Sequence, residues 1–157
     1  MGTGLLAPPE QPAVTKHLRQ QEFNMQTFEA AQRWATTWAT AWPLKDVNAI
    51  VQLQADDGDH WASMFRPLRG PSGLRAYLEE CFGEETQPAE TWFSEPIVNG
   101  SLASVEYWVV MFIKDQPMTV SGCTILSFDE SGAVTTARDY SHVKDGHHLR
   151  PELPFSA

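Results

Sequence analysis

The second half of the chain is a succession of extended segments separated by turn signals, and this pattern constrains the fold more than any other feature. The segments are rich in β-branched and aromatic residues and span residues 91–98, 102–114, 118–128 and 134–143. Short polar stretches separate them: Asn99–Gly100, Asp115–Gln116 and residues 129–132. Because connections this short join neighbouring antiparallel strands, the pattern predicts a meander of four antiparallel strands.

Helical patterns dominate the chain before these strands. Apolar residues recur every three or four positions from residue 28 to 42, and Pro43 stops this first predicted helix. A second helix is predicted from residue 45 to the acidic cluster at 56–59. A short strand at 60–65 and a third helix at 74–82 complete the predicted order.

Helices followed mainly by antiparallel strands predict an α+β fold, in which the helices cover one face of the sheet. The segment 102–114 adds a further constraint, because it is apolar on both faces. One face carries Val105, Val109 and Met111, and the other carries Trp108, Val110 and Phe112. One face therefore packs on the interior, and the other also requires a cover.

A chain of 157 residues can bury one continuous core and is too short for two ordinary domains. Residues 1–23 contain early prolines and glycines and no sustained apolar period, which predicts a flexible leader. Residues 24–145 form the predicted domain, and 146–157 form a C-terminal tail without periodic pattern.

Charge and composition exclude several classes of partner. The net charge of -9 repels phosphate backbones and anionic lipid surfaces, so neither nucleic acid nor membrane is an expected partner. Without an apolar membrane span or a basic leader, the expected location is the cytoplasm. Cys81 and Cys123 are far apart, which predicts two reduced thiols, and the pair His147–His148 lacks further ligands at metal spacing. We therefore expect no metal site and no cofactor.

Seven short sequence words, in this order along the chain, resemble the SnoaL-like branch of the nuclear-transport-factor-2-like superfamily. They are WATAW at 38–42, DVNAIV at 46–51, ADD at 55–57, GLRAYL at 73–78, VEYW at 105–108, FDESG at 128–132 and RDY at 138–140. The resemblance implies three N-terminal helices packed on a strongly curved, mainly antiparallel sheet, with a conical pocket between them. It also implies a homodimer formed through the outer sheet face.

The resemblance gives uneven support for individual chemistries. The places of the three catalytic residues of ketosteroid isomerases fall at Trp38, Ala62 and Thr124. The tyrosine and the two acids that catalyse that reaction are therefore absent from these positions. The limonene epoxide hydrolase positions fall at Tyr107, Val109, Asp139, His60 and Ala62, which leaves one acid. SnoaL-type polyketide cyclases rely on a single aspartate at the place of Asp139. Asp139 therefore matches two chemistries by position.

Strand alternation gives Asp139 and His60 as catalytic candidates. Asp139 shares a face with Ala137 and Ser141, which directs it into the cavity, where desolvation makes a carboxylate a usable proton carrier. The alternative is a structural carboxylate held by Arg138, Tyr140 or a backbone amide. His60 shares its alternation with Ala62 and is expected to face Asp139, or else to be an ordinary core or rim histidine.

The predicted pocket lining follows from the same alternation and from the resemblance. It consists of Trp38, Trp42, Ala62, Tyr107, Val109, Thr124 and Leu126. Tryptophans in a helical stripe are usually core residues, but aromatic walls also suit a cavity for flat apolar ligands. Glu106 is a minor candidate, because alternation sends it to the outer face unless a bulge shifts the strand.

Three functions remain open from the sequence. The first is a cofactor-free isomerase, cyclase or hydrolase that acts on a small hydrophobic compound bearing a carbonyl or hydroxyl group, by aspartate acid/base catalysis. The second is a binding module for the same kind of ligand without turnover, and the third is a structural or assembly domain with a closed cavity. An open cavity of roughly 300 Å³ or more would favour the first two, and a collapsed one the third.

Overall fold

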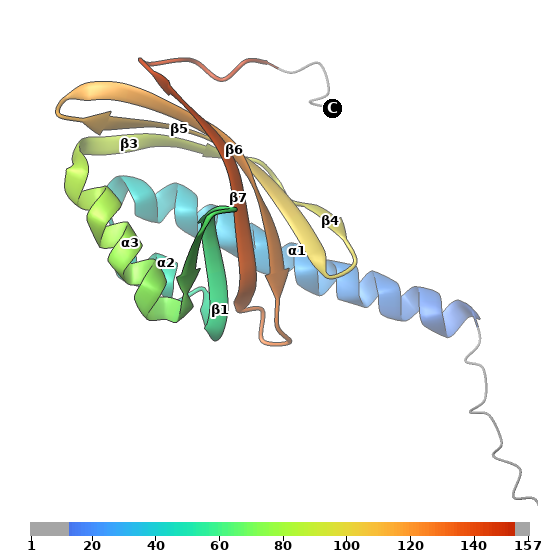
Figure 1. The fold of residues 1–157 in the computed structure, drawn as a ribbon. Coiled ribbons are helices and arrows are strands. Elements are labelled where there is room, and N and C mark those ends of the chain that lie inside the picture. The colour runs from blue at the N-terminus through green and yellow to red at the C-terminus, as the bar shows by residue number, and fades with distance from the viewer. Residues whose placement is uncertain (1–12, 153–157) are drawn as a thin grey trace, which may run out of the picture.

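The computed structural model describes residues 13–152, which form three helices and seven strands (Figure 1). The helices are α1 Ala13–Leu44, α2 Val47–Val51 and α3 Gly70–Glu84. The strands are β1 Gln54–Ser63, β2 Arg66–Arg69, β3 Glu85–Phe93, β4 Ile97–Asn99, β5 Leu102–Ile113, β6 Gln116–Phe128 and β7 Val134–Asp145. Within this described part of the chain, no helix is both long and apolar enough to cross a membrane.

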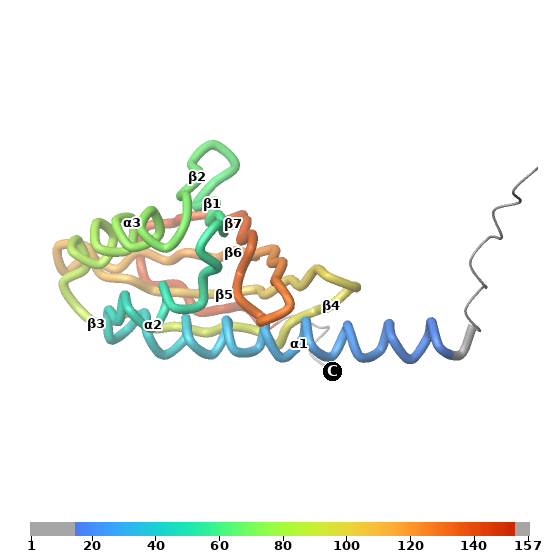
Figure 2. Tube along the Cα trace, turned by 90° about the horizontal axis from the view of Figure 1, so that it is seen from below, coloured from blue at the N-terminus to red at the C-terminus, as the bar shows by residue number. Residues whose placement is uncertain are grey.

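The strands form one strongly curved sheet in the order β2-β1-β7-β6-β5-β3, with β4 paired to β5. All pairs are antiparallel except β1 with β7, which is parallel. Helix α1 lies along the inside of the curve, and α3 closes the end near β1 and β3 (Figures 1 and 2). The predicted α+β fold of helices on a curved, mainly antiparallel sheet is confirmed.

The core fills the space between the helices and the concave face of the sheet. Apolar side chains from all three helices meet those of the sheet there, among them Trp34, Trp38, Ile50, Leu74, Leu78, Val105 and Leu126. At roughly 25 cal/mol per Å² of apolar surface, each large side chain buried in this way contributes about 2 kcal/mol. The stripe of aromatic and aliphatic residues in the sequence therefore has a packing role first.

Helix α1 begins earlier than the sequence pattern predicted. Residues 13–23, expected in a flexible leader, are helical, whereas residues 1–12 lie outside the described part. The side chains from 16 to 23 are exposed, which is why no apolar stripe marks this segment. Two contacts hold the helix to the turn before β5: Thr27 Oγ1 donates to the Gly100 carbonyl at 3.0 Å, and Asn24 Oδ1 accepts from the Gly100 amide at 3.1 Å.

The second predicted helix is shorter, and the strand that follows it is longer. Asp46 caps α2 by accepting a hydrogen bond from the Ala49 amide at 3.0 Å, but the helix ends at Val51. The acidic cluster expected to end it lies inside β1, because this strand pairs with β7. Gly58 permits that approach, since a Cβ there would lie 2.3 Å from the Val134 carbonyl oxygen.

The sheet also differs from the prediction at its edges. The predicted strand 91–98 is two strands, because β3 already begins at Glu85 and β4 is separate. Pro88 lies where the register of β3 against β5 shifts, as expected for a proline on an edge strand. The short strand β2 was not predicted. It forms a hairpin with β1, in which Arg66 pairs with Ser63.

The C-terminal tail lies over the outer face of the sheet. Trp108 Nε1 donates to the carbonyl oxygen of His148 at 2.8 Å, and the guanidinium of Arg150 lies 3.9 Å from the centre of the Trp92 ring. Val110, on the same face of β5 as Trp108, is only 3% exposed. Part of the apolar outer face is therefore covered by the chain itself.

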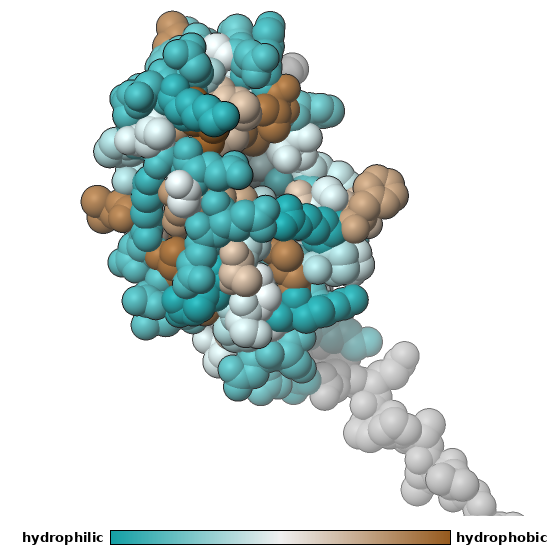
Figure 3. Space-filling view, turned by 60° about the vertical axis from the view of Figure 1, so that its left-hand side comes forward, coloured by the Kyte–Doolittle hydropathy of each residue, from teal (hydrophilic) through white to brown (hydrophobic). Residues whose placement is uncertain are grey.

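The face of the molecule seen in Figure 3 is mostly hydrophilic. On this face the hydrophobic residues form separate spots among hydrophilic ones. Single exposed apolar side chains are normal in folded proteins. This side of the molecule therefore offers no broad apolar docking surface.

Candidate functional site

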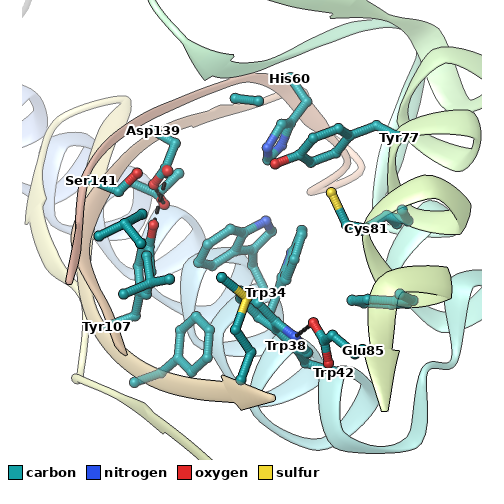
Figure 4. A pocket seen from close by; sticks show the side chains of 18 residues that line it. Trp34, Trp38, Trp42, His60, Tyr77, Cys81, Glu85, Tyr107, Asp139 and Ser141 are labelled. Carbon is teal, nitrogen blue, oxygen red and sulfur yellow. Dashed lines mark hydrogen bonds between the residues drawn. The ribbon is translucent and has the colours of Figure 1, made fainter. Parts of the chain in front are cut away.

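A cavity of about 190 Å³ lies between α1, α3 and the concave face of the sheet (Figure 4). Most of its wall is aromatic or aliphatic. The lining residues are Trp34, Trp38, Trp42, His60, Ala62, Tyr77, Leu78, Cys81, Phe82, Glu85, Phe93, Tyr107, Met111, Val120, Thr124, Asp139, Ser141 and Val143. The volume lies below the roughly 300 Å³ of a typical ligand pocket, yet the side chains do not fill the space.

Asp139 projects from β7 into this cavity and is held by side chains of the next two strands in the sheet, β6 and β5. The Tyr107 hydroxyl of β5 donates to Oδ2 at 2.8 Å, and the Thr124 hydroxyl of β6 donates to Oδ1 at 3.0 Å. Thr124 is directly opposite Asp139 in the β6–β7 register. The anchors are thus cross-strand hydroxyls, and not the sequence neighbours Arg138 and Tyr140.

Burial raises the pKa of the Asp139 carboxyl above its ordinary value, while hydrogen bonds from Tyr107, Ser141 and Thr124 act in the opposite direction. A raised pKa makes the carboxylate a stronger base, so it takes up a proton more readily than an exposed aspartate does. Desolvation and hydrogen bonding therefore leave Asp139 as a carboxyl that can exchange a proton with a neighbour in the cavity.

Gly122 supports this arrangement from β6. It is paired with Tyr107, and a Cβ at Gly122 would lie 2.6 Å from the Tyr107 hydroxyl oxygen. No real Cβ contact is that short, so the tyrosine ring can lie against the sheet only because residue 122 lacks a side chain. Sequence reasoning did not identify Gly122, although a glycine inside a predicted strand is a signal of close approach.

Gly122→Ala should therefore displace the Tyr107 side chain and break its hydrogen bond to Asp139. We expect a loss of about 1 to 3 kcal/mol in the free energy of unfolding, measured by chemical denaturation, because a buried acceptor loses its donor. Gly83→Ala is the matched control, since nothing lies within 4 Å of a Cβ built there. Equal stability of the two variants would contradict the proposed contact.

His60 projects from β1 and lies between two aromatic rings. Its ring is stacked on Trp38, with centroids 5.9 Å apart, and its centroid is 6.3 Å from that of Tyr77. Its Nδ1 is buried and has no hydrogen-bond partner among the described residues. Burial lowers the pKa of His60 to about 4, so the ring is neutral at physiological pH.

The low pKa of His60 predicts a pH dependence of stability. Between its ordinary pKa of 6.5 and the folded value of about 4, the unfolded chain binds the proton and the folded chain does not. The free energy of unfolding is therefore unaffected by the titration of His60 above pH 6.5, and it falls by roughly 3 kcal/mol as the pH is lowered from 6.5 to about 4.

Urea denaturation across this pH range measures the effect, with His60→Gln as the comparison. The difference in unfolding free energy between the wild type and this variant should shrink as the pH falls. The raised pKa of Asp139 acts with the opposite sign, but it cancels because both proteins retain that residue. A difference that does not change with pH would contradict a buried neutral histidine.

The structure brings together most of the predicted site residues. Asp139 and His60 both line the cavity, as do the predicted wall residues Trp38, Trp42, Ala62, Tyr107 and Thr124. Glu106 is exposed on the outer face, because the pairing of β5 with β6 contains no bulge.

Val109 and Leu126 must be removed from the predicted lining. Both are fully buried from solvent, and neither contacts the cavity. Leu126 lies in the main core, and Val109 packs in a smaller cluster with Ala89, Tyr107 and Val120. Alternation placed both on the concave face, but neighbouring side chains fill the space above them.

Besides Ser141, which shares the face of Asp139, three polar residues of the lining were not predicted. Tyr77 and Cys81 come from α3, on the side that also carries Leu78, so the helical period was an available signal. Glu85 follows several other glutamates, a pattern typical of a solvated surface, but it is only 4% exposed and accepts a hydrogen bond from Trp42 Nε1 at 2.8 Å. Burial raises the pKa of Glu85.

The lining has no arrangement suited to a metal ion. Over residues 13–152, no three His, Cys, Asp or Glu side chains lie close enough together to hold one. The polar groups of the cavity instead comprise two carboxyls, a neutral imidazole and several hydroxyls. Such groups accept and donate hydrogen bonds and exchange protons.

Comparison with known proteins gives a family and two similar structures. The model of a family described as the SnoaL-like domain matches residues 31–137. An LEH-like epoxide hydrolase from M. tuberculosis is similar over 76% of this chain and 84% of its own, with a TM-score of 0.60 and 18% identity.

The second structure is a hypothetical protein with a ketosteroid isomerase-like fold from Catenulispora acidiphila DSM 44928, in complex with trimethylamine. It is similar over 67% of this chain and 82% of its own, with a TM-score of 0.59 and 21% identity. At these identities the two structures establish a shared fold alone. No curated protein has a sequence that matches this chain.

Proposed function

The chain belongs to the SnoaL-like domain family, and from this premise we propose that its cavity binds a small hydrophobic compound bearing a carbonyl or hydroxyl group. We further propose that Asp139 exchanges a proton with that compound, as an isomerase or cyclase does. The observation that carries the proposal is a hydrogen-bonded carboxyl with a raised pKa in the wall of an apolar cavity.

The size of the cavity indicates a ligand of about one ring. An engineered apolar cavity of roughly 150 Å³ in another protein binds benzene, so about 190 Å³ suits a single substituted ring. A compound with several fused rings needs considerably more space. The flat aromatic walls provided by Trp38, Trp42 and Phe93 favour the same class.

The charges of the lining indicate that the ligand is not an anion. Asp139 and Glu85 are acidic, and no lysine or arginine in the described part of the chain lines the cavity. An anion would lose its hydration there without gaining a cationic partner. A neutral ligand avoids that cost, which agrees with a ketone, an alcohol or a similar group.

The experiment uses a β,γ-unsaturated cyclohexenone, a one-ring ketone whose activated α-proton lies between the carbonyl and the double bond. Transfer of that proton to the γ-carbon gives the conjugated isomer, which is followed by ultraviolet absorbance. We expect the wild type to catalyse this isomerisation and to bind cyclohexanone, read by tryptophan fluorescence, more tightly than cyclohexanecarboxylate. No isomerisation despite ketone binding would contradict the catalytic part.

A binding module without turnover is the second candidate, because one specific observation favours it. Both oxygens of Asp139 already accept hydrogen bonds from the protein. A carboxylate held in this way has fewer free lone pairs for a ligand proton. Ketone binding without isomerisation in the experiment above is the outcome that this candidate predicts.

A homodimer through the outer sheet face is also proposed. The tail lies over Trp108 and Val110, so a second copy must use the rest of that face or displace the tail. Light scattering at micromolar concentration on the full chain and on a chain ending at Asp145 measures the effect. We expect dimers for the full chain and tighter ones for the shortened chain, and monomers of both would contradict the proposal.

A further inference from the structure

The proposed proton transfer requires a second group, opposite Asp139, that stabilises the ligand oxygen. When a proton leaves the carbon next to a carbonyl, the negative charge that develops moves to the carbonyl oxygen. A hydrogen-bond donor fixed at that position lowers the barrier. The hydroxyls of Tyr107 and Thr124 are engaged with Asp139, and the indole N–H of Trp42 is engaged with Glu85.

Tyr77 reaches into the cavity from the opposite wall. It comes from α3, whereas Asp139 comes from the sheet, and its hydroxyl lies at the inner end of the ring beside His60 (Figure 4). Its ring position is fixed by the His60 ring, 6.3 Å away, and by the guanidinium of Arg66, 5.0 Å from the ring centre. The ring is therefore held by neighbours that do not use its hydroxyl.

Among residues 13–152, the hydroxyl of Tyr77 has only a weak partner. Its neighbour is the Cys81 thiol, one turn further along α3, and sulfur is a poor hydrogen-bond acceptor. Burial raises the pKa of Tyr77, and the Asp139 carboxyl across the cavity raises it further. The hydroxyl therefore stays protonated and can donate a hydrogen bond to a better acceptor.

We propose that Tyr77 donates a hydrogen bond to the carbonyl oxygen of the ligand while Asp139 takes the proton from the adjacent carbon. This inference rests on the proposed function and names the residue that determines its substrate class, a compound with a hydrogen-bond-accepting oxygen. The C–H electron pair becomes a carbon–carbon double bond, and the carbonyl π electrons move to the oxygen that Tyr77 stabilises. Asp139 then gives the proton to the γ-carbon, which bonds it with the π electrons of the original double bond. The newly formed double bond shifts to the position between the α- and β-carbons, and the electron pair on oxygen re-forms the carbonyl, while Tyr77 keeps its own proton throughout.

The carbonyl stretching frequency of bound cyclohexanone tests this directly, without turnover. A donated hydrogen bond lowers that frequency, so infrared difference spectra should show a lower value in the wild type than in Tyr77→Phe. The variant keeps the ring that packs on His60 and loses only the hydroxyl. The isomerisation rate of the unsaturated cyclohexenone should fall by about 10²- to 10³-fold, as for the loss of one oxyanion donor, with little change in KM.

Tyr140→Phe is the matched control, because Tyr140 lies on the same strand as Asp139 but is 46% exposed and does not line the cavity. It should leave both the frequency and the rate unchanged. A wild-type frequency that persists in Tyr77→Phe would overturn this inference while leaving the proposed function standing. A wild type that binds no cyclohexanone would overturn both, and so the two failures are distinguishable.

Discussion

Asp139→Asn should lower the isomerisation rate of the unsaturated cyclohexenone by about 10²- to 10⁴-fold and leave the affinity for cyclohexanone nearly unchanged. Asparagine has the shape of the carboxyl but carries no exchangeable acidic proton. The hydroxyls of Tyr107 and Thr124 can rotate to donate to the amide oxygen or accept from the amide nitrogen, so most of the hydrogen bonding survives. Stopped-flow absorbance and fluorescence titration measure the two quantities.

Thermal melting of the same variant separates the catalytic role from a structural one. If Asp139 were only an anchor for Tyr107 and Thr124, the substitution would leave the isomerisation rate unchanged, and any effect would appear as a loss of stability. Asp145→Asn is the control, since Asp145 ends the same strand and is exposed. A variant that melts several degrees lower but isomerises at the wild-type rate would end the catalytic account.

Trp38→Ala should destabilise the domain by about 3 to 5 kcal/mol, the largest stability effect that we predict. Trp38 is 6% exposed and lies within 6 Å, centroid to centroid, of Trp34, Trp42 and the His60 ring. Removing the indole deletes these contacts at once and joins its volume to the cavity. Chemical denaturation measures the loss in the free energy of unfolding.

The enlarged cavity should also accept larger ligands. Where Trp38→Ala stays folded, two-ring ketones should bind more tightly than to the wild type, and cyclohexanone more weakly. Trp61→Ala is the control, because Trp61 is only partly buried and packs beneath the Arg69 guanidinium, 5.4 Å from its ring centre. That change should cost about 1 kcal/mol. Equal costs for the two tryptophans would contradict the assignment of Trp38 to the pocket wall.

The sequence predicts the class of this fold because two periods dominate it. The stripe Trp34, Trp38 and Trp42 has the spacing of a helix, and the later segments have the turn residues of a meander. The parallel pairing of β1 with β7 has no such local signal, because it joins segments that are far apart in the chain. Residues 54–59 also lack a local signal for a strand. Their acidic composition indicates a turn, and they are extended in the structure because β1 pairs with β7.

Details of the sheet register depend on the turn between β5 and β6. A turn centred on Asp115–Gln116, as the sequence suggests, would pair Tyr107 with Thr124. In the structure, Lys114 and Asp115 both have positive φ and form the tight turn, which pairs Tyr107 with Gly122. A change of register by two residues keeps each side chain on its face, so the faces predicted from alternation do not depend on which of the two turns forms.

Strand alternation predicts which face of the sheet a residue lies on, but not whether it reaches the cavity. Alternation gives the face of Asp139, His60 and Thr124, and all three line the cavity. It does not say how far from the closed end a residue lies, and so Leu126 was included although core side chains cover it. Tyr77 was passed over because a helical residue next to Leu78 is equally typical of the core.

A crystal structure of the chain with cyclohexanone bound is the most direct test of the claim that this cavity is a site of proton exchange. The account predicts the ring inside the cavity against Trp38, with the carbon next to the carbonyl within about 3.5 Å of the Asp139 carboxyl. A ring bound elsewhere, or an Asp139 carboxyl turned away from the bound ketone, would contradict it.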